Sequence, residues 1–459
     1  MTAPLIISVS GLRGIVGESL TVDVALRYVD ALVDELQSAG ADGPIVLTRD
    51  GRANGPPLAE AIFAHLDRRG TTCLDGGVAA TPTTGVLVRQ TGAAGGVQVS
   101  ASHNPAEYNG LKLFDRTGRV VPAEFGMRVL RRYEQDAAQS TGRSIPGPPA
   151  SKSERVDGYA VIAQHLELIA AACDVARIRS RRFRVVLDAN HGSGSLLGRA
   201  LLSHLGCNTI VLGDSPDGLF AHPPEPTEAN LQAVLQRIVE AGADAGFCQD
   251  PDADRLAIID ERGRYLGEEC TLALVADHVL RSGRRGPVVT NCSTSRMTED
   301  LARRYGVPFF RSKVGEANVV DAMLAEGAVL GGEGNGGGID PRGGVVRDSF
   351  VGMALALDAM AARGAPLSAL AAELPQYAIH KSAIAVPQGA VEGALDKLAA
   401  RFSDAIPSRL DGLRLDWPDG AWLLVRASNT EPIVRAVAEA PTLERARELC
   451  ESAAGVISG

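Results

Sequence analysis

The strongest constraint on the fold is a pattern that recurs along the chain. A short run of β-branched and other apolar residues is followed by a glycine-rich or polar turn, and then by an amphipathic stretch with helical periodicity. Segments 44–70 and 183–206 are two instances, and polar side chains collect where their apolar runs end. Strands that alternate with helices predict parallel sheets covered by helices, with ligands bound at the carboxyl ends of the strands. The expected fold class is therefore α/β.

The length of the chain predicts more than one domain. With 459 residues it exceeds one ordinary core, and typical domain sizes predict roughly three or four domains. Segment 141–154 is rich in proline, serine and glycine, so we interpret it as a linker. A second change of pattern lies near residues 365–378, and the sequence beyond it predicts a small α+β domain.

Composition disfavours several classes of partner. A formal net charge of −9 and an aromatic content of 4% are not typical of nucleic-acid binding. The seven cysteines are scattered without CxxC spacing, which favours reduced thiols over disulfides or a zinc site. Residues 1–20 do not resemble a signal peptide, and no apolar run is long enough to span a bilayer. We expect a cytoplasmic protein with neither a membrane nor a nucleic-acid partner.

A loop with alternating carboxylates predicts a cation site. Asp250, Asp252 and Asp254 occur in the segment QDPDADR, where a curled loop would direct all three carboxylates at one hard cation. A calcium EF-hand fits Glu261 at loop position twelve, but Arg255 stands where that loop needs glycine. A solvated acidic turn is the simpler alternative for an isolated motif. Carboxylates beside an arginine favour Mg²⁺ shared with a phosphate.

Two further loops have the composition of ligand-binding segments. Arg426 follows a strand-like run and offers a planar fork for phosphate oxygens, and an anion nest completes the expected clamp. The other members of that clamp are Ser428, Asn429, Thr430 and Arg435. The glycine loop GGEGNGGG carries only Glu333 and Asn335 as polar side chains. It lacks the lysine of a P-loop; alone it predicts a flexible turn, and beside the other clusters it predicts a reader of sugar hydroxyls.

A polar stretch around Ser102 raises the question of a nucleophile. The segment SASHNP follows an apolar, glycine-rich run, and His103 is adjacent to the serine. Adjacent side chains normally diverge, and GxSxG is absent, so a hydrolase triad is not favoured. The remaining chemistry is phosphoryl transfer, in which the serine carries the phosphoryl group and a metal neutralises its charge.

Together these segments resemble the α-D-phosphohexomutase family, whose members interconvert hexose 6-phosphates and 1-phosphates. The resemblance rests on SASHNP, DPDADR, GEGNGG and RASNTEP, in the order of the family, with SGLRGIVGESLT and HPPEPTEANL as supporting segments. It implies four domains around a central cleft, three with helix-covered mixed or parallel sheets and a smaller C-terminal α+β domain. The implied ranges are a phosphoserine-loop domain (1–148), a metal-loop domain (149–257), a sugar-loop domain (258–370) and a C-terminal phosphate-binding domain (371–459).

The resemblance also implies a role for each matching residue. The catalytic set would be Ser102, Arg13, Lys112 and Arg255, with proton transfer near Arg13 and Lys112. One Mg²⁺ would be held by Ser102, Asp250, Asp252 and Asp254. Substrate would be bound by His103, Glu333, Asn335, Arg426, Ser428, Asn429, Thr430 and Arg435. Ser102 would be a phosphoserine, a sugar bisphosphate would act as activator, and the enzyme would be a monomer or homodimer.

Two positions depart from the family pattern. Many members carry a histidine at the position of Gly337, and some carry one at the position of Glu316, so the general base is open. The glycine-rich loop is more similar to archaeal-type phosphoglucosamine mutases, which makes that activity the first expectation. Phosphomannomutase or phosphoglucomutase activity, a metal-dependent phosphosugar phosphatase and a non-catalytic sugar-phosphate binder are the alternatives.

Overall fold

The apolar runs form the strands of four sheets in the computed structural model, which describes residues 4–138, 152–385, 391–427 and 433–458. The first sheet has the order β1-β2-β6-β5-β3-β4-β7 and is mixed, because β3 pairs parallel with β4 and β5 while β6 runs antiparallel to β5. Its strands are β1 (Ile6–Ser8), β2 (Gly11–Ile15), β3 (Ile45–Arg49), β4 (Cys73–Val78), β5 (Gly95–Val99), β6 (Tyr108–Asp115) and β7 (Glu154–Arg155). Its helices are α1 (Val22–Ser38), α2 (Gly55–Arg68), α3 (Thr81–Gln90) and α4 (Ala123–Ala138).

The second and third sheets are four-stranded and share one arrangement, with two parallel pairings and one antiparallel edge strand. The second, ordered β11-β10-β8-β9, contains β8 (Arg184–Asp188), β9 (Asn208–Leu212), β10 (Ala245–Gln249) and β11 (Leu256–Ile259). The third, ordered β13-β12-β14-β15, contains β12 (Val288–Asn291), β13 (Phe309–Ser312), β14 (Leu330–Glu333) and β15 (Gly337–Ile339).

Seven helices of the described chain pack around these two sheets and bury one continuous apolar core, in which Leu187, Leu274 and Phe350 belong to the same cluster. They are α5 (Gly158–Ala172), α6 (Val175–Arg181), α7 (Gly194–His204), α9 (Glu268–Arg281), α10 (Met297–Arg304), α12 (Ser349–Arg363) and α13 (Leu367–Ala372). Helices α8 (Gln232–Ala241) and α11 (Glu316–Glu326) bury their apolar residues in two smaller separate clusters. The shared core holds the second and third domains together, because separating them would expose this apolar surface to water.

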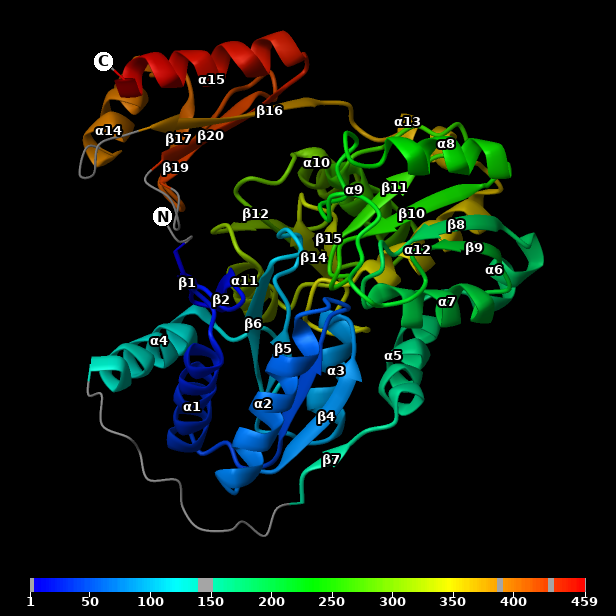
Figure 1. Cartoon of the computed structure of the whole chain (residues 1–459). Coiled ribbons are helices and arrows are strands. Elements are labelled where there is room, and N and C mark those ends of the chain that lie inside the picture. The colour runs from blue at the N-terminus through cyan, green and yellow to red at the C-terminus, as the bar shows by residue number, and fades with distance from the viewer. Residues whose placement is uncertain (1–3, 139–151, 386–390, 428–432, 459) are drawn as a thin grey trace.

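The C-terminal domain is an antiparallel sheet with two helices and its own apolar core. Its strands, ordered β16-β20-β19-β18-β17, are β16 (Ala378–Ala385), β17 (Ile406–Ser408), β18 (Leu413–Asp416), β19 (Trp422–Ala427) and β20 (Ile433–Ala440). Its helices are α14 (Val391–Arg401) and α15 (Leu443–Ser458). Figure 1 shows this domain, in orange to red, at one end of the molecule and the blue N-terminal domain at the other. The expected four-domain α/β organisation is confirmed.

The structure also bears on the expectations for the cysteines and for membrane-spanning helices. All seven cysteines are free, as predicted from their spacing. No single helix within these residues has the length and apolarity of a membrane span; α5 and α6 reach that limit only as a pair, which is bent by 87°.

The loops singled out in the sequence follow strand ends. Ser102 follows β5, the three aspartates follow β10, and Glu333 is the last residue of β14. Parallel strands bring such ends to one side of their sheet, the edge at which ligands bind in sheets of this kind.

Candidate active site

The serine loop of the first domain contacts the aspartate loop of the second domain. Ser102 is buried, and its hydroxyl donates a hydrogen bond of 2.7 Å to Oδ2 of Asp250. Its backbone has φ of 50°, in the left-handed region that few residues other than glycine adopt. This conformation turns the serine side chain out of the strand direction and towards the second domain.

The same backbone conformation overturns one expectation. Ser102 and His103 do not diverge, since the hydroxyl oxygen lies 3.4 Å from Nδ1 of His103. Adjacent side chains diverge in regular extended backbone, and the left-handed residue breaks that rule. Burial lowers the pKa of His103 to about 3, helped by the positive charges of Arg255 and Arg13. The imidazole is therefore neutral at pH 7.

The three aspartates form a compact, buried cluster. Each is fully buried, and one carboxylate oxygen from each lies within 4.8 Å of the others. Ala253, between two of them, has φ of 55° and curls the loop. Oδ1 of Asp252 and Oδ1 of Asp254 are buried without a hydrogen-bond partner. Unpartnered carboxylate oxygens are costly unless a cation binds them, so the donor set fits a hard divalent ion such as Mg²⁺.

Lysine 112 compensates part of the negative charge. Its ammonium contacts Oδ2 of Asp252 at 2.5 Å and Oδ2 of Asp254 at 2.7 Å. Burial lowers the pKa of Lys112, but the charges of these two carboxylates outweigh it and the net shift is upwards. Burial and the same two charges raise the pKa of Asp250 well above its ordinary range. The positive charges beside the cluster thus leave the pKa of Asp250 raised, and a bound cation would lower it.

Two arginines contact residues of the serine and aspartate loops. Arg13, on β2, donates from its guanidinium to Oδ1 of Asn104 at 3.1 Å. Arg255 donates its backbone N–H to Oδ1 of Asp250, and its guanidinium contacts Glu225 at 3.4 Å. Both expected positions therefore border the two loops, although neither guanidinium donates a hydrogen bond to Ser102 within the described residues.

The sugar loop presents Glu333 and Asn335 on the third domain. Oε1 of Glu333 accepts hydrogen bonds from the Asn291 side chain at 2.7 Å and from the Gly315 N–H at 3.0 Å. Oε2 accepts from Asn335 at 3.4 Å. The carboxylate is thus held in one orientation at the strand end.

The C-terminal domain supplies Arg426 from β19. Its Nε lies 3.1 Å from Oδ2 of Asp411. Arg435 lies directly opposite it on β20, so the two side chains project from the same face of the sheet. The other predicted members of this clamp, Ser428, Asn429 and Thr430, lie outside the described residues.

Comparison with known proteins identifies the family. Models of the phosphoglucomutase/phosphomannomutase family match residues 5–140 (alpha/beta/alpha domain I), 163–263 (domain II), 268–377 (domain III) and 383–456 (C-terminal domain). The chain belongs to the phosphoglucomutase/phosphomannomutase family. This confirms the resemblance seen in the sequence and the expected enzyme class, a phosphosugar mutase.

Individual relatives cover almost the whole chain of this phosphohexomutase. A phosphoglucomutase/phosphomannomutase of Thermococcus kodakarensis is 36% identical over 450 residues, covering 96% of each chain. A probable phosphoglucosamine mutase of Methanopyrus kandleri is 34% identical over 444 residues, covering 96% of this chain and 95% of the relative. Among solved structures, a phosphoglucomutase/phosphomannomutase family protein of Burkholderia thailandensis matches with a TM-score of 0.85 and 27% identity, covering 100% and 98% of the two chains.

Sequence reasoning missed Arg347, which joins the metal loop to the sugar loop. Its guanidinium donates to Asp254 at 2.7 Å, to Glu333 at 3.1 Å and to Glu316 at 3.2 Å. A Cβ atom at position 337 would lie 2.3 Å from Cδ of this arginine. The two departures from the family pattern therefore belong to one arrangement, since Gly337 leaves room for the arginine and Glu316 pairs with it.

Arg52 was also missed, and it shapes the serine loop of the phosphohexomutase. It is buried, its Nε pairs with Asp50, and its two terminal nitrogens donate to four backbone carbonyls of the loop. These are the carbonyls of Ser102, Asn104, Pro105 and Tyr108, at 2.6, 2.6, 2.6 and 3.1 Å respectively. The available signal was the Asp-Gly-Arg sequence directly after a strand.

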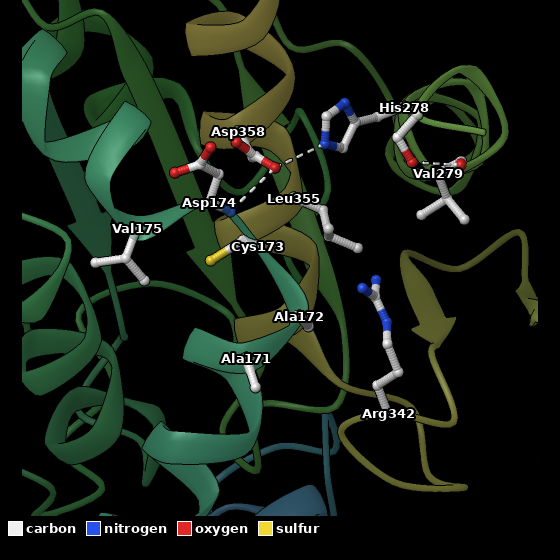
Figure 2. A pocket seen from close by; sticks show the side chains of 11 residues that line it. Ala171, Ala172, Cys173, Asp174, Val175, His278, Val279, Arg342, Leu355 and Asp358 are labelled. Carbon is white, nitrogen blue, oxygen red and sulfur yellow. Dashed lines mark hydrogen bonds and ion pairs between the residues drawn. The ribbon is translucent and has the colours of Figure 1, made fainter. Parts of the chain in front are cut away.

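A cavity lies apart from the aspartate cluster in the phosphohexomutase. It has a volume of about 520 Å³ and lies between the α5–α6 junction, α9 and α12 (Figure 2). Asp358, on its wall, accepts hydrogen bonds from His278 at 3.0 Å and from Arg177 at 2.7 Å. These polar groups stabilise the packing of the second domain on the third. Neither Ser102 nor the aspartate cluster lines this cavity, so its size does not identify the reactive site.

Proposed function

We propose that this phosphohexomutase interconverts hexose 6-phosphate and hexose 1-phosphate through a phosphoserine at Ser102 and a bisphosphorylated sugar intermediate. One observation carries the proposal, namely the 2.7 Å contact between the Ser102 hydroxyl and Asp250, beside two unpartnered carboxylate oxygens. A nucleophile or phosphoryl carrier and a cation site thus share one buried cluster.

The residues divide the work of phosphoryl transfer. Asp250, Asp252 and Asp254 would hold Mg²⁺, which supplies charge neutralisation for the phosphoryl group. The P–Oγ bond at Ser102 breaks as a bond forms from phosphorus to a sugar hydroxyl oxygen. Lys112 holds its proton, and the pKa of His103 is lowered to about 3, so neither side chain is suited to accept the hydroxyl proton at pH 7 and the general base is not assigned. The bisphosphate then turns over and returns its other phosphate to Ser102.

Substrate recognition is divided between the two remaining loops. Glu333 and Asn335 would accept and donate hydrogen bonds to sugar hydroxyls, and Arg426 with Arg435 would hold the phosphate that does not react. An arginine fork matches phosphate geometry whichever end of the sugar carries it. This independence from the sugar ring is what a mutase needs, because its intermediate binds in two orientations.

For the sugar itself we favour glucosamine phosphates. Support comes from the glycine-rich form of the sugar loop and from relatives named probable phosphoglucosamine mutase, such as that of Methanopyrus kandleri. The relative named phosphoglucomutase/phosphomannomutase at 36% identity supports glucose and mannose phosphates as the second candidate.

Coupled assays with glucosamine, glucose and mannose phosphates test the proposal. We expect turnover that is fastest with glucosamine phosphate, phosphate on Ser102 in the purified protein, and nearly complete loss of turnover in Ser102→Ala. Normal activity in that variant would refute the phosphoserine mechanism. Release of free phosphate instead of isomerised sugar phosphate would indicate a phosphatase, and binding without turnover would indicate a non-catalytic binder.

A further inference from the structure

The C-terminal domain contacts the third domain through Asp411, in the turn between β17 and β18. Its Oδ2 accepts a hydrogen bond of 2.9 Å from the Val314 N–H of the third domain. The same oxygen lies 3.1 Å from Nε of Arg426. The two side chains of this ion pair are only 17% and 14% exposed, so solvent screens their attraction less than at the open surface.

The turn is built to bring Asp411 to this place. Gly412 has φ of 73°, and a Cβ there would lie 2.4 Å from the carbonyl oxygen of Val425. Only glycine allows the turn to lie this close to β19. The side chain of Val314 packs against an apolar cluster of Cys292, Trp422 and Leu424. This packing holds the Val314 N–H in place against the C-terminal sheet.

The next residue of the third domain continues the connection. The Gly315 N–H donates to Oε1 of Glu333 at 3.0 Å, directly after the Val314 N–H that donates to Asp411. Two consecutive backbone donors therefore join the ion pair of Arg426 to the carboxylate of the sugar loop. A displacement of Asp411 would shift Val314 and, with it, the adjacent Gly315 N–H that binds Glu333.

A second contact between the domains ends at the same carboxylate. Arg414 donates to the Cys292 carbonyl at 2.5 Å, and the neighbouring Asn291 donates its side-chain N–H to Glu333. Arg414 is itself held by Asp416 and lies 4.1 Å from the centroid of a Trp422 ring. Glu333 is thus held by two segments that both contact the C-terminal domain.

We propose that Asp411 is a positioning residue that couples phosphate binding at Arg426 to sugar recognition at Glu333. This inference rests on the proposed function, which assigns phosphate to Arg426 and sugar hydroxyls to Glu333. Asp411 places its negative charge 3.1 Å from Nε of Arg426 and at the same time accepts the Val314 N–H, which directly precedes the N–H that binds Glu333. A sugar phosphate that binds both groups benefits from this shared support, so the contributions of Asp411 and Glu333 to its affinity are not independent.

A double-mutant cycle in full-length protein tests the coupling. All variants carry Ser102→Ala to prevent turnover, and calorimetry measures the Kd of glucosamine 6-phosphate and, in parallel, glucose 6-phosphate. We expect Asp411→Ala to weaken binding at least about fivefold when Glu333 is present, the lower end of typical coupling. In the Glu333→Gln background we expect the same change to weaken binding less than about twofold, since the coupled partner is already lost.

The inference would be overturned if Asp411→Ala weakened binding by the same factor with Glu333 present and in the Glu333→Gln background. It would also be overturned if Asp411→Ala did not change Kd. Asp396→Ala is the matched control, because it removes an exposed ion pair with Arg409 in the same domain and should leave Kd unchanged. Circular dichroism checks the fold, and if Asp411→Ala does not fold, the isosteric Asp411→Asn replaces it in the same cycle. If the wild-type protein has mutase activity but the effects of Asp411→Ala and Glu333→Gln on Kd are additive, the coupling is refuted and the proposed function is not. Absence of both sugar-phosphate binding and mutase activity would refute the proposed function as well.

Discussion

The hydroxyl of Ser102 donates to the carboxylate of Asp250 across 148 residues of sequence and from one domain to the next. Around this contact two carboxylate oxygens remain buried without a partner. Such a cluster is stable in a folded protein only when a proton, a cation or another donor offsets its charge. Metal binding should therefore affect stability as well as turnover.

Magnesium is expected to stabilise the folded protein through the aspartate cluster. At one hundred times its Kd, a ligand that binds only the folded state adds about 2.7 kcal/mol to the free energy of unfolding. Thermal unfolding with Mg²⁺ or with EDTA measures the gain. Asp254→Asn should lose it, whereas Asp214→Asn, at an exposed ion pair of the same domain, should keep it. An equal Mg²⁺-dependent shift of Tm in Asp254→Asn would contradict the site.

The room left by Gly337 for Arg347 gives a second prediction. Because a Cβ at position 337 would lie 2.3 Å from Cδ of Arg347, Gly337→Ala should displace the arginine from its three carboxylates. We expect a loss of about 1–3 kcal/mol in the free energy of unfolding, as for other overpacked sites, together with at least a tenfold lower kcat/KM.

The neighbouring Gly338 provides the control for this prediction. A Cβ there would meet its nearest neighbour, a Leu272 methyl carbon, at 3.9 Å, which is an ordinary contact. Gly338→Ala should therefore change the free energy of unfolding by no more than about 0.5 kcal/mol. Similar effects of the two substitutions, in chemical denaturation and in steady-state kinetics, would show that Arg347 does not depend on the space at position 337.

The sequence allowed the fold class and the aspartate cluster to be predicted, because both depend on local patterns. Strands and helices alternate along the chain, and the three aspartates lie within five residues of one loop. Arg347 and Arg52 could not be predicted in the same way. Arg347 acts on Asp254, 93 residues away, and Arg52 acts on Ser102, 50 residues away. Such contacts depend on how domains pack, which residue spacing does not reveal.

The wrong expectation for Ser102 and His103 has a local cause. A serine rarely adopts positive φ, and nothing in the residues SASHNP alone indicates it. The strain is stabilised from outside the loop, by the four hydrogen bonds of Arg52 to backbone carbonyls. Backbone strain at a reactive residue usually has such external support.

Replacement of Arg52 should therefore disturb the conformation of the serine loop more than any other part of the site. Arg52→Lys loses the planar fork that serves several carbonyls at once. It should lower the free energy of unfolding by about 1–3 kcal/mol, as expected when buried carbonyls lose their donors, and should reduce the phosphate carried by Ser102, measured by intact mass. Arg68→Lys, at an exposed arginine of α2 that bonds its own helix, is the control. Full phosphorylation of Ser102 in Arg52→Lys would contradict this role.

The pH dependence of stability should report on Glu269, at the first turn of α9. Burial raises the pKa of its carboxyl from the ordinary value of 4.5 to about 8, although a hydrogen bond from the Ser295 N–H opposes the shift. Because the pKa is higher in the folded state, the stabilising contribution is complete below pH 4.5 and is lost as pH rises through 8.

The free energy of unfolding should therefore fall over this interval. The upper limit is about 1.4 kcal/mol per pH unit, and the actual fall should be smaller because solvent screens a partly buried side chain. Glu269→Gln cannot ionise, so its denaturation curves between pH 5 and 8 should show a smaller slope than those of the wild type. Glu444→Gln, at an exposed residue of α15, should keep the wild-type slope. An unchanged slope in Glu269→Gln would show that Glu269 is already ionised in the folded protein at neutral pH.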